Sequence, residues 1–133
     1  MRILIVDDEF QNRMLLEKYL AKYGECDFAA NGQEAVEVFE FGMEEGAPYD
    51  LVCMDIMMPI MDGQSALEHL RSIEDKHRRP GRKETVVFMV SALDTEEHVV
   101  KAFFRGGCTD YLTKPVTQAK LIQKLKDYKL IPD

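Results

Sequence analysis

The segment Tyr49-Asp50-Leu51-Val52-Cys53-Met54-Asp55 is the most informative about the fold, because its apolar residues from Leu51 onward run without a break and end on an acid. Apolar runs of this kind are typical of strands that are buried on both faces of a parallel sheet. Two other runs have the same character, Arg2 to Asp7 and Thr85 to Val90. An acid at the carboxyl end of such a strand is placed to form part of a binding site.

Strand patterns alternate with helical ones along the rest of the chain. Further strands are predicted at Cys26 to Ala30 and at Thr109 to Leu112, and residues at helical spacing lie between the strands. Helix starts are indicated by the capping residues Asn31, Asp62, Asp94 and Thr117. Strict alternation requires right-handed crossovers, which predicts an α/β fold: a doubly wound parallel sheet of about five strands, flanked by about five helices.

Composition and charge favour one compact domain. The 133 residues, 46% of them apolar, can bury a single core, so we expect one domain over residues 1–133. No apolar run reaches the roughly 20 residues of a membrane span, and the start Met1-Arg2-Ile3 lacks the pattern of a secretory signal. We therefore expect a cytoplasmic protein. A net charge of −7 disfavours nucleic acid and anionic membranes as partners.

The three cysteines, Cys26, Cys53 and Cys108, are odd in number and have apolar neighbours. This pattern indicates reduced, buried thiols rather than disulfides or a metal cluster. The segment Lys76 to Lys83 is strongly basic and contains the turn pair Pro80-Gly81. We interpret it as a solvated loop, with a docking patch as the alternative.

Charged residues lie just past the ends of the predicted strands. Asp7, Asp8 and Asp55 supply carboxylates, and Lys114 supplies a cation after the last strand. If the strands that end at Asp7 and Asp55 are neighbours at the point where strand order reverses, these groups converge in one pocket. Three acids and a lysine suggest a divalent metal and a phosphoryl group. Taken singly, the acids also fit helix caps or turns, and the lysine fits a solvated side chain.

Four blocks resemble the receiver domain of two-component response regulators, the family of the chemotaxis response regulator. The blocks are Asp7-Asp8-Glu9, Asp55-Ile56-Met57-Met58-Pro59-Ile60-Met61-Asp62-Gly63, Ser91-Ala92 and Tyr111-Leu112-Thr113-Lys114-Pro115. The resemblance covers essentially the whole chain. It implies the flavodoxin-like strand order 2-1-3-4-5, which is carried over from the family rather than worked out from the residues. It also implies a cis peptide at Lys114-Pro115.

The resemblance implies a role for each site residue. Asp55 would accept a phosphoryl group from a histidine kinase, with Mg²⁺ or Mn²⁺ held by Asp7, Asp8, Asp55 and the backbone carbonyl of Met57. Phosphoryl oxygens would be contacted by three further groups: the Lys114 ammonium, the Ser91 hydroxyl and a backbone N–H at Ala92.

The switch and the partners also come from the resemblance. Ser91 and Tyr111 would rearrange on phosphorylation and alter a face made of the fourth helix, the fifth strand and the fifth helix, roughly Asp94 to Phe104 and Thr109 to Leu130. The partners would be a sensor histidine kinase or histidine phosphotransfer protein and a downstream effector protein, without direct nucleic-acid binding or membrane insertion.

Alternative functions differ in the fate of the phosphoryl group. The chain fits a stand-alone regulator, a phosphorelay intermediate, or a receiver cut from a larger regulator or hybrid kinase. A magnesium-dependent phosphatase of the haloacid dehalogenase kind is disfavoured, because the general acid it needs two residues after the nucleophile is replaced by Met57. A scaffold that no longer accepts phosphate is disfavoured by the retained acids, serine and lysine. We therefore expect a signalling domain that catalyses only its own phosphorylation and dephosphorylation. Apolar Met57 and Leu93 suggest a long-lived phosphoryl group.

Overall fold

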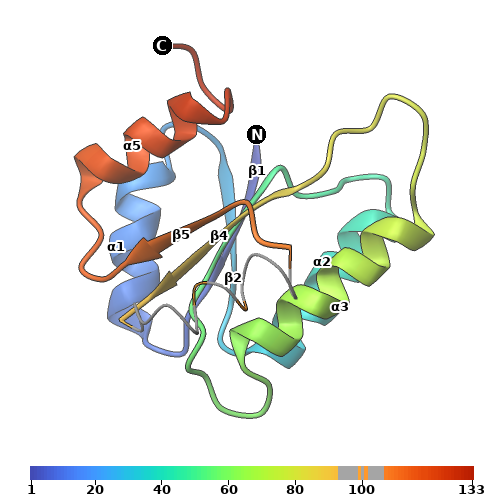
Figure 1. Ribbon diagram of the computed structural model, residues 1–133, viewed down its shortest axis with the longest axis horizontal. Helices are drawn as coiled ribbons and strands as arrows, with labels where there is room; N and C mark the ends of the chain where they lie inside the picture. The colour runs from blue at the N-terminus through green and yellow to red at the C-terminus, as the bar shows by residue number, and fades with distance from the viewer. Residues whose placement is uncertain (93–98, 100, 102–106) are drawn as a thin grey trace.

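The computed structural model describes residues 1–92, 99, 101 and 107–133. The strands are β1 (Arg2–Val6), β2 (Glu25–Ala29), β3 (Leu51–Met54), β4 (Val86–Ser91) and β5 (Asp110–Thr113), and the helices are α1 (Phe10–Leu20), α2 (Gly32–Glu44), α3 (Gly63–Lys76) and α5 (Gln118–Asp127) (Figure 1). Of the helix expected to start at Asp94, only Val99 and Lys101 are described, and Leu93 lies outside the described residues, so four of the five expected helices can be compared. Within the described ranges, no helix is long and apolar enough to cross a membrane.

All five strands are parallel and lie in the order β2-β1-β3-β4-β5, which confirms the expected doubly wound sheet. The strand β1 pairs with β2 on one side and with β3 on the other. The strand order therefore reverses beside β1, and this reversal opens a crevice at the carboxyl ends of β1 and β3.

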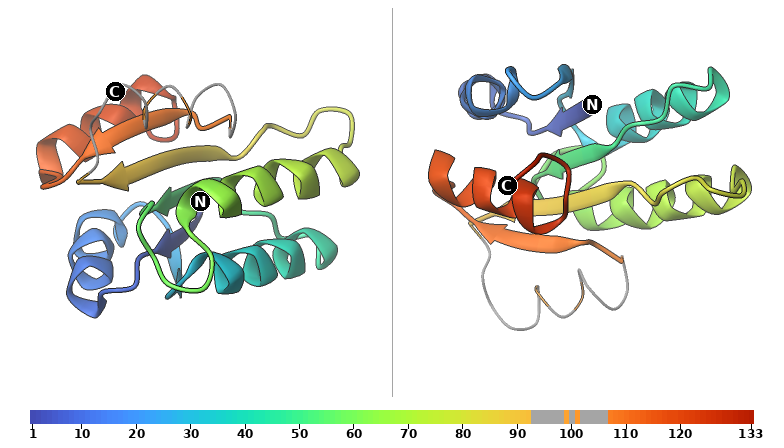
Figure 2. Two further views of the ribbon diagram at one scale, coloured as in Figure 1. Left: turned by 60° about the horizontal axis from the view of Figure 1, so that its bottom comes forward. Right: turned by 90° about the horizontal axis from the view of Figure 1, so that it is seen from above.

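Helices cover both faces of the sheet. Helices α1 and α5 lie on one face, and α2 and α3 lie on the other (Figures 1 and 2). The continuous apolar runs explain this, because successive side chains of a strand point to opposite faces. In β1, Ile3 and Ile5 join the core beneath α1 and α5, while Leu4 and Val6 join the core beneath α2 and α3. Each fully buried side chain of this size contributes about 1.5–3 kcal/mol.

Three helices begin where capping residues predict. The side chains of Asn31, Asp62 and Thr117 accept backbone N–H hydrogen bonds from Glu34, Ser65 and Lys120 respectively. Each bond satisfies one of the N–H groups that the first turn of a helix leaves unpaired. These short-range contacts place the helix starts at the edge of the sheet where the strands end.

The cysteines are free thiols, as the sequence predicts. Cys53 and Cys108 are buried, and Cys26 is half-buried. Burial raises the pKa of the Cys53 thiol to about 12 and that of Cys108 to about 11. At neutral pH these groups are therefore protonated and weakly reactive.

Candidate functional site

Three carboxylates meet beside the strand β1. The Asp7 N–H donates to the carbonyl of Ala29 (3.2 Å) and the Asp55 N–H donates to the carbonyl of Val6 (3.0 Å), so both acids continue the strand ladder by one residue. Oxygens of Asp7, Asp8 and Asp55 lie within 4.8 Å of one another. Asp7 and Asp55 are buried, whereas Asp8 is exposed. The topology thus brings together acids that lie far apart in the sequence.

Lys114 joins this cluster from the end of β5. Its Nζ lies 2.9 Å from Asp7 Oδ2 and 3.1 Å from Asp55 Oδ2. Burial alone lowers the pKa of Lys114, but the hydrogen bonds and charges of Asp7 and Asp55 outweigh it and raise this pKa above its ordinary value. The ammonium is therefore charged at neutral pH. The Lys114-Pro115 peptide is cis, as the resemblance implies.

Asp7 is also held by α1. Its Oδ1 accepts the Glu9 N–H (2.9 Å) and lies 3.4 Å from Asn12 Nδ2, and its carbonyl accepts from Arg13 Nη1 (2.7 Å). The helix cap itself is Glu9, whose side chain makes no capping bond. Asp7 therefore turns the chain into α1 with one oxygen and reaches Lys114 with the other. Sequence reasoning gave Asn12 and Arg13 no role, although their place on the first turns after the acids is a usable signal.

Two glycines fix the loop between Asp55 and α3. Gly63 N–H donates to the Ile56 carbonyl (2.8 Å), and a Cβ at Gly63 would stand 1.9 Å from the Asp55 carbonyl oxygen. Gly32 N–H donates to the Met61 carbonyl (2.9 Å), and a Cβ there would stand 2.4 Å from that oxygen. Any larger residue has to move backbone at either position. Sequence reasoning assigned neither glycine a role, although each directly follows a helix cap.

The other predicted residues lie on β4, on β5 and on the segments that follow β3 and β4. Ser91 is buried at the end of β4, where its carbonyl accepts the Lys114 N–H (2.9 Å), and Ala92 beside it is exposed. Met57 lies two residues past Asp55 with 65% of its surface exposed. Tyr111 is partly buried and packs against the core beneath α2 and α3. Each of these residues thus lies on β4, on β5 or on the segments just past the ends of β3 and β4.

The sequence profile of the response regulator receiver domain matches residues 3–126. The chain belongs to this family. Among curated proteins, it is 36% identical over 127 residues to the sensory/regulatory protein RpfC of Xanthomonas campestris; the match covers 96% of this chain but only 16% of that relative.

Solved structures of receiver domains have the same fold. One is a co-crystal of the Saccharomyces cerevisiae histidine phosphotransfer protein Ypd1 with the receiver domain of its downstream response regulator Ssk1 (29% identity, TM-score 0.84, 100% of this chain and 93% of that one). Another is the receiver domain of the sensor histidine kinase PA1611 of Pseudomonas aeruginosa, with magnesium coordinated in the active site cleft (27% identity, TM-score 0.75, 96% and 95% covered).

The carboxylates of this receiver domain fit a hard divalent cation. Asp7, Asp8 and Asp55 supply only oxygen ligands, which Mg²⁺ and Mn²⁺ prefer. Lys114 is paired with two of these acids, so the four side chains together keep an excess of negative charge. Receiver domains bind Mg²⁺ at an acidic site of this kind, and the acidic cluster of this chain has the donor chemistry for it.

Proposed function

We propose that this receiver domain accepts a phosphoryl group on Asp55, from a histidine kinase or histidine phosphotransfer protein, and thereby controls a partner protein. The observation that carries the proposal is the placement of Asp55. This residue is 8% exposed, has a carboxylate oxygen within 4.8 Å of oxygens of Asp7 and Asp8, and has Oδ2 3.1 Å from the Lys114 ammonium.

The transfer reaction needs what these residues supply. One Asp55 oxygen forms a bond to phosphorus while the donor's N–P bond breaks, and its electron pair leaves with the imidazole nitrogen, which takes up a proton. Both reactants are negatively charged, so the positive charge of Lys114 lowers the barrier by stabilising the phosphoryl oxygens as charge moves. A bound Mg²⁺ or Mn²⁺ would neutralise further negative charge at the same oxygens. Asp7, Asp8, Asp55 and the Met57 carbonyl are the groups proposed to hold the cation.

The remaining residues are proposed to recognise the phosphoryl group and report it. Ser91 and the backbone at Ala92 lie at the end of β4, directly beside β5, since Ser91 pairs in register with Thr113. A Ser91 hydroxyl drawn toward the phosphoryl group would change the space available to Tyr111, whose strand partner is Met89. The partner face would then change along β5 and α5. The part of this partner face that is predicted from Asp94 to Phe104 lies almost entirely outside the described residues.

The similarity to Ssk1 supports a phosphotransfer protein as donor, because that receiver was crystallised with Ypd1. RpfC supports the alternative that the chain acts within a larger protein, since the match spans only 16% of it. A phosphatase function is not supported, because Met57 stands where the general acid would be needed and an exposed thioether cannot donate a proton. Slow hydrolysis of the phosphoryl group stays a prediction, in which the apolar Met57 side chain limits the approach of water.

Mass spectrometry of the intact protein tests the proposal. With acetyl phosphate and Mg²⁺ the wild type should gain about 80 Da, the mass of one phosphoryl group on a nucleophilic carboxylate. Asp55→Asn should gain nothing. Asp50→Asn is the matched control, because Asp50 is an exposed acid at the other end of β3 and should leave labelling unchanged. No mass gain in the wild type, or an equal gain in Asp55→Asn, would reject the proposal, and rapid decay of the label would reject slow hydrolysis.

A further inference from the structure

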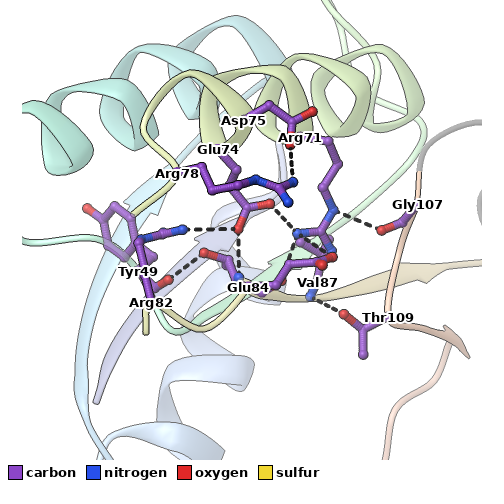
Figure 3. A network of polar contacts seen from close by, with 11 residues as sticks. Tyr49, Arg71, Glu74, Asp75, Arg78, Arg82, Glu84, Val87, Gly107 and Thr109 are labelled. Carbon is purple, nitrogen blue, oxygen red and sulfur yellow. Dashed lines mark hydrogen bonds and ion pairs between the residues drawn. The ribbon is translucent and has the colours of Figure 1, made fainter. Parts of the chain in front are cut away.

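The basic segment Lys76 to Lys83 borders a second charged site at the other end of the sheet. Helix α3 runs antiparallel to the strands, so its last turns lie beside the amino end of β4, away from the acids (Figures 1 and 3). A cavity of ≈ 370 Å³ opens here, lined by four arginines and three acids. We call it the arginine cavity and define it by Arg71, Glu74, Arg82 and Glu84.

Buried Glu74 organises this cavity. Its Oε2 accepts the Thr85 N–H (2.7 Å) and lies 3.7 Å from Arg82 Nη1, while its Oε1 accepts from Arg71 Nη1 (Figure 3). Arg71 also donates from Nε to the Gly107 carbonyl (2.9 Å) and from Nη1 to the Thr85 carbonyl (2.8 Å). These bonds hold the Arg71 guanidinium in place, and the ion pair with Glu74 brings Arg82 to the same carboxylate.

Two guanidinium nitrogens of the lining arginines have almost no exposed surface and no partner among the described residues. Arg71 Nη2 and Arg82 Nε are buried and have no hydrogen-bond partner within the part of the chain that the structure describes. Buried donors are almost always paired, because leaving water without a replacement acceptor is unfavourable. These two nitrogens carry three N–H groups without an acceptor in this part of the chain, so an acceptor from outside it can pair with them.

Charge and geometry indicate the chemical class of acceptor that fits these donors. Four arginines face three acids, so the lining carries one excess positive charge in a protein of net charge −7. Guanidinium groups match the paired oxygens of carboxylates and phosphates, and a cavity of this size is in the range of small-ligand sites. Nucleic acid fits poorly, because the overall charge of the protein repels a polyanion.

We propose that the arginine cavity binds an oxyanion, a phosphate or carboxylate group, with the guanidinium groups of Arg71 and Arg82 as donors. Glu84 is the built-in competitor of this ligand. Its side chain is 72% exposed and its Oε1 lies 3.3 Å from Arg71 Nη1, so it supplies a carboxylate that a bound oxyanion displaces. The site lies at the opposite end of the sheet from Asp55, so the proposal does not rest on phosphorylation there.

Amide NMR titration of the metal-free protein tests the proposal. Sodium phosphate, added at constant ionic strength, should cause saturable shifts at Arg71, Glu74, Arg82 and Glu84 that are separate from any shifts around Lys114. Arg82→Gln should weaken this binding about tenfold, the loss expected for one charge-assisted hydrogen bond. Lys76→Gln makes the same charge change on an exposed side chain outside the cavity, and should weaken it less than about twofold.

A substitution that removes the competing carboxylate should have the opposite effect on phosphate affinity. Glu84→Gln should tighten phosphate binding several-fold, while Glu45→Gln, the same change on an exposed residue after α2, should leave it nearly unchanged. This arm keeps the test decisive if Arg82→Gln does not fold. Tighter binding of phosphate than of acetate assigns a phosphate-bearing ligand, and equal or tighter binding of acetate assigns a carboxylate such as an acidic side chain of a partner. Absence of saturable shifts with either ion, or equal weakening by Arg82→Gln and Lys76→Gln, would overturn the proposal.

Discussion

The two ends of the sheet collect charge in opposite ways. At the carboxyl end, Asp7, Asp8 and Asp55 gather around a single lysine, so like charges stay close together. At the amino end, Glu74 lies between Arg71 and Arg82, and opposite charges nearly balance. Like charges in proximity cost stability, and paired charges with good hydrogen bonds do not. Substitutions among the acids at the carboxyl end should therefore change phosphoryl transfer more than the free energy of unfolding. Substitutions at the amino end should change the free energy of unfolding more.

The largest effect should come from Lys114→Met. Without the ammonium beside Asp55, phosphoryl oxygens lose a positioned positive charge, and phosphorylation by acetyl phosphate should slow by about 100- to 1000-fold. The rate of mass gain at saturating Mg²⁺ measures this. Lys76→Met, on the exposed end of α3, is the control and should label at the wild-type rate. An unchanged labelling rate in Lys114→Met would contradict the expectation that charges at the carboxyl end of the sheet promote phosphoryl transfer.

Glu74→Gln should cause the largest loss of stability. The buried carboxylate bonds to Arg71 and to the Thr85 N–H and pairs with Arg82, so the loss of its charge leaves Arg71 with only the exposed Glu84 as an ion-pair partner among the described residues and removes the ion pair of Arg82. We expect a decrease of about 2–3 kcal/mol in the free energy of unfolding, measured by urea denaturation. Asp75→Asn breaks the exposed Arg78–Asp75 pair one residue further on and should cost at most about 1 kcal/mol. Equal losses would show that burial of Glu74 has no special importance.

Asp55→Asn should shift stability in the opposite direction. Replacing one of three neighbouring carboxylates relieves repulsion, so in EDTA the variant should be more stable than the wild type by about 1 kcal/mol. Added Mg²⁺ should stabilise the wild type more than the variant, because a ligand stabilises the state that binds it. Thermal unfolding with and without the metal measures both effects. If Asp55→Asn is less stable than the wild type in EDTA, this would contradict the view that repulsion among the three carboxylates destabilises the fold.

The smallest effect concerns pH at the start of β5. Burial alone raises the pKa of Asp110, but Lys124, the Tyr111 N–H and Tyr128 outweigh it and hold this pKa below its ordinary value. A depressed folded-state pKa gives stability that is present above the unfolded pKa of about 3.9 and is lost as pH falls through the lower folded value. The stability difference between wild type and Asp110→Asn should therefore shrink with acidification in this range. A difference that stays constant would contradict the shift.

Local sequence features predicted much of the fold because their physical causes are local. The capping bonds of Asn31, Asp62 and Thr117 span three residues each, so a short motif specifies them. The apolar runs of β1 and β3 likewise indicated burial on both faces. Strand order was different, since it came from a family resemblance and not from the runs themselves. The convergence of Asp7 with Asp55 could be expected only on the condition that β1 and β3 are neighbours.

Long-range contacts escaped the sequence because no short pattern encodes them. The basic segment was interpreted as a solvated loop, and most of its residues are exposed, but the Arg82 side chain is only 19% exposed and lies 3.7 Å from Glu74. Arg71 bonds the carbonyl of Gly107, 36 residues away, and Gly63 is required by the closeness of the Asp55 carbonyl. Such demands arise only when separate elements pack.

Which residues carry charge, which runs enter a core and where helices begin were fixed at the level of the amino-acid sequence, because they depend on side-chain chemistry and on neighbours within a turn. Which charges meet was set by the packing of the elements. That packing placed three acids against one lysine at one end of the sheet and balanced arginines with glutamates at the other. The physical reason is that electrostatic energy depends on distance in space and on burial, and neither of these follows from separation along the chain.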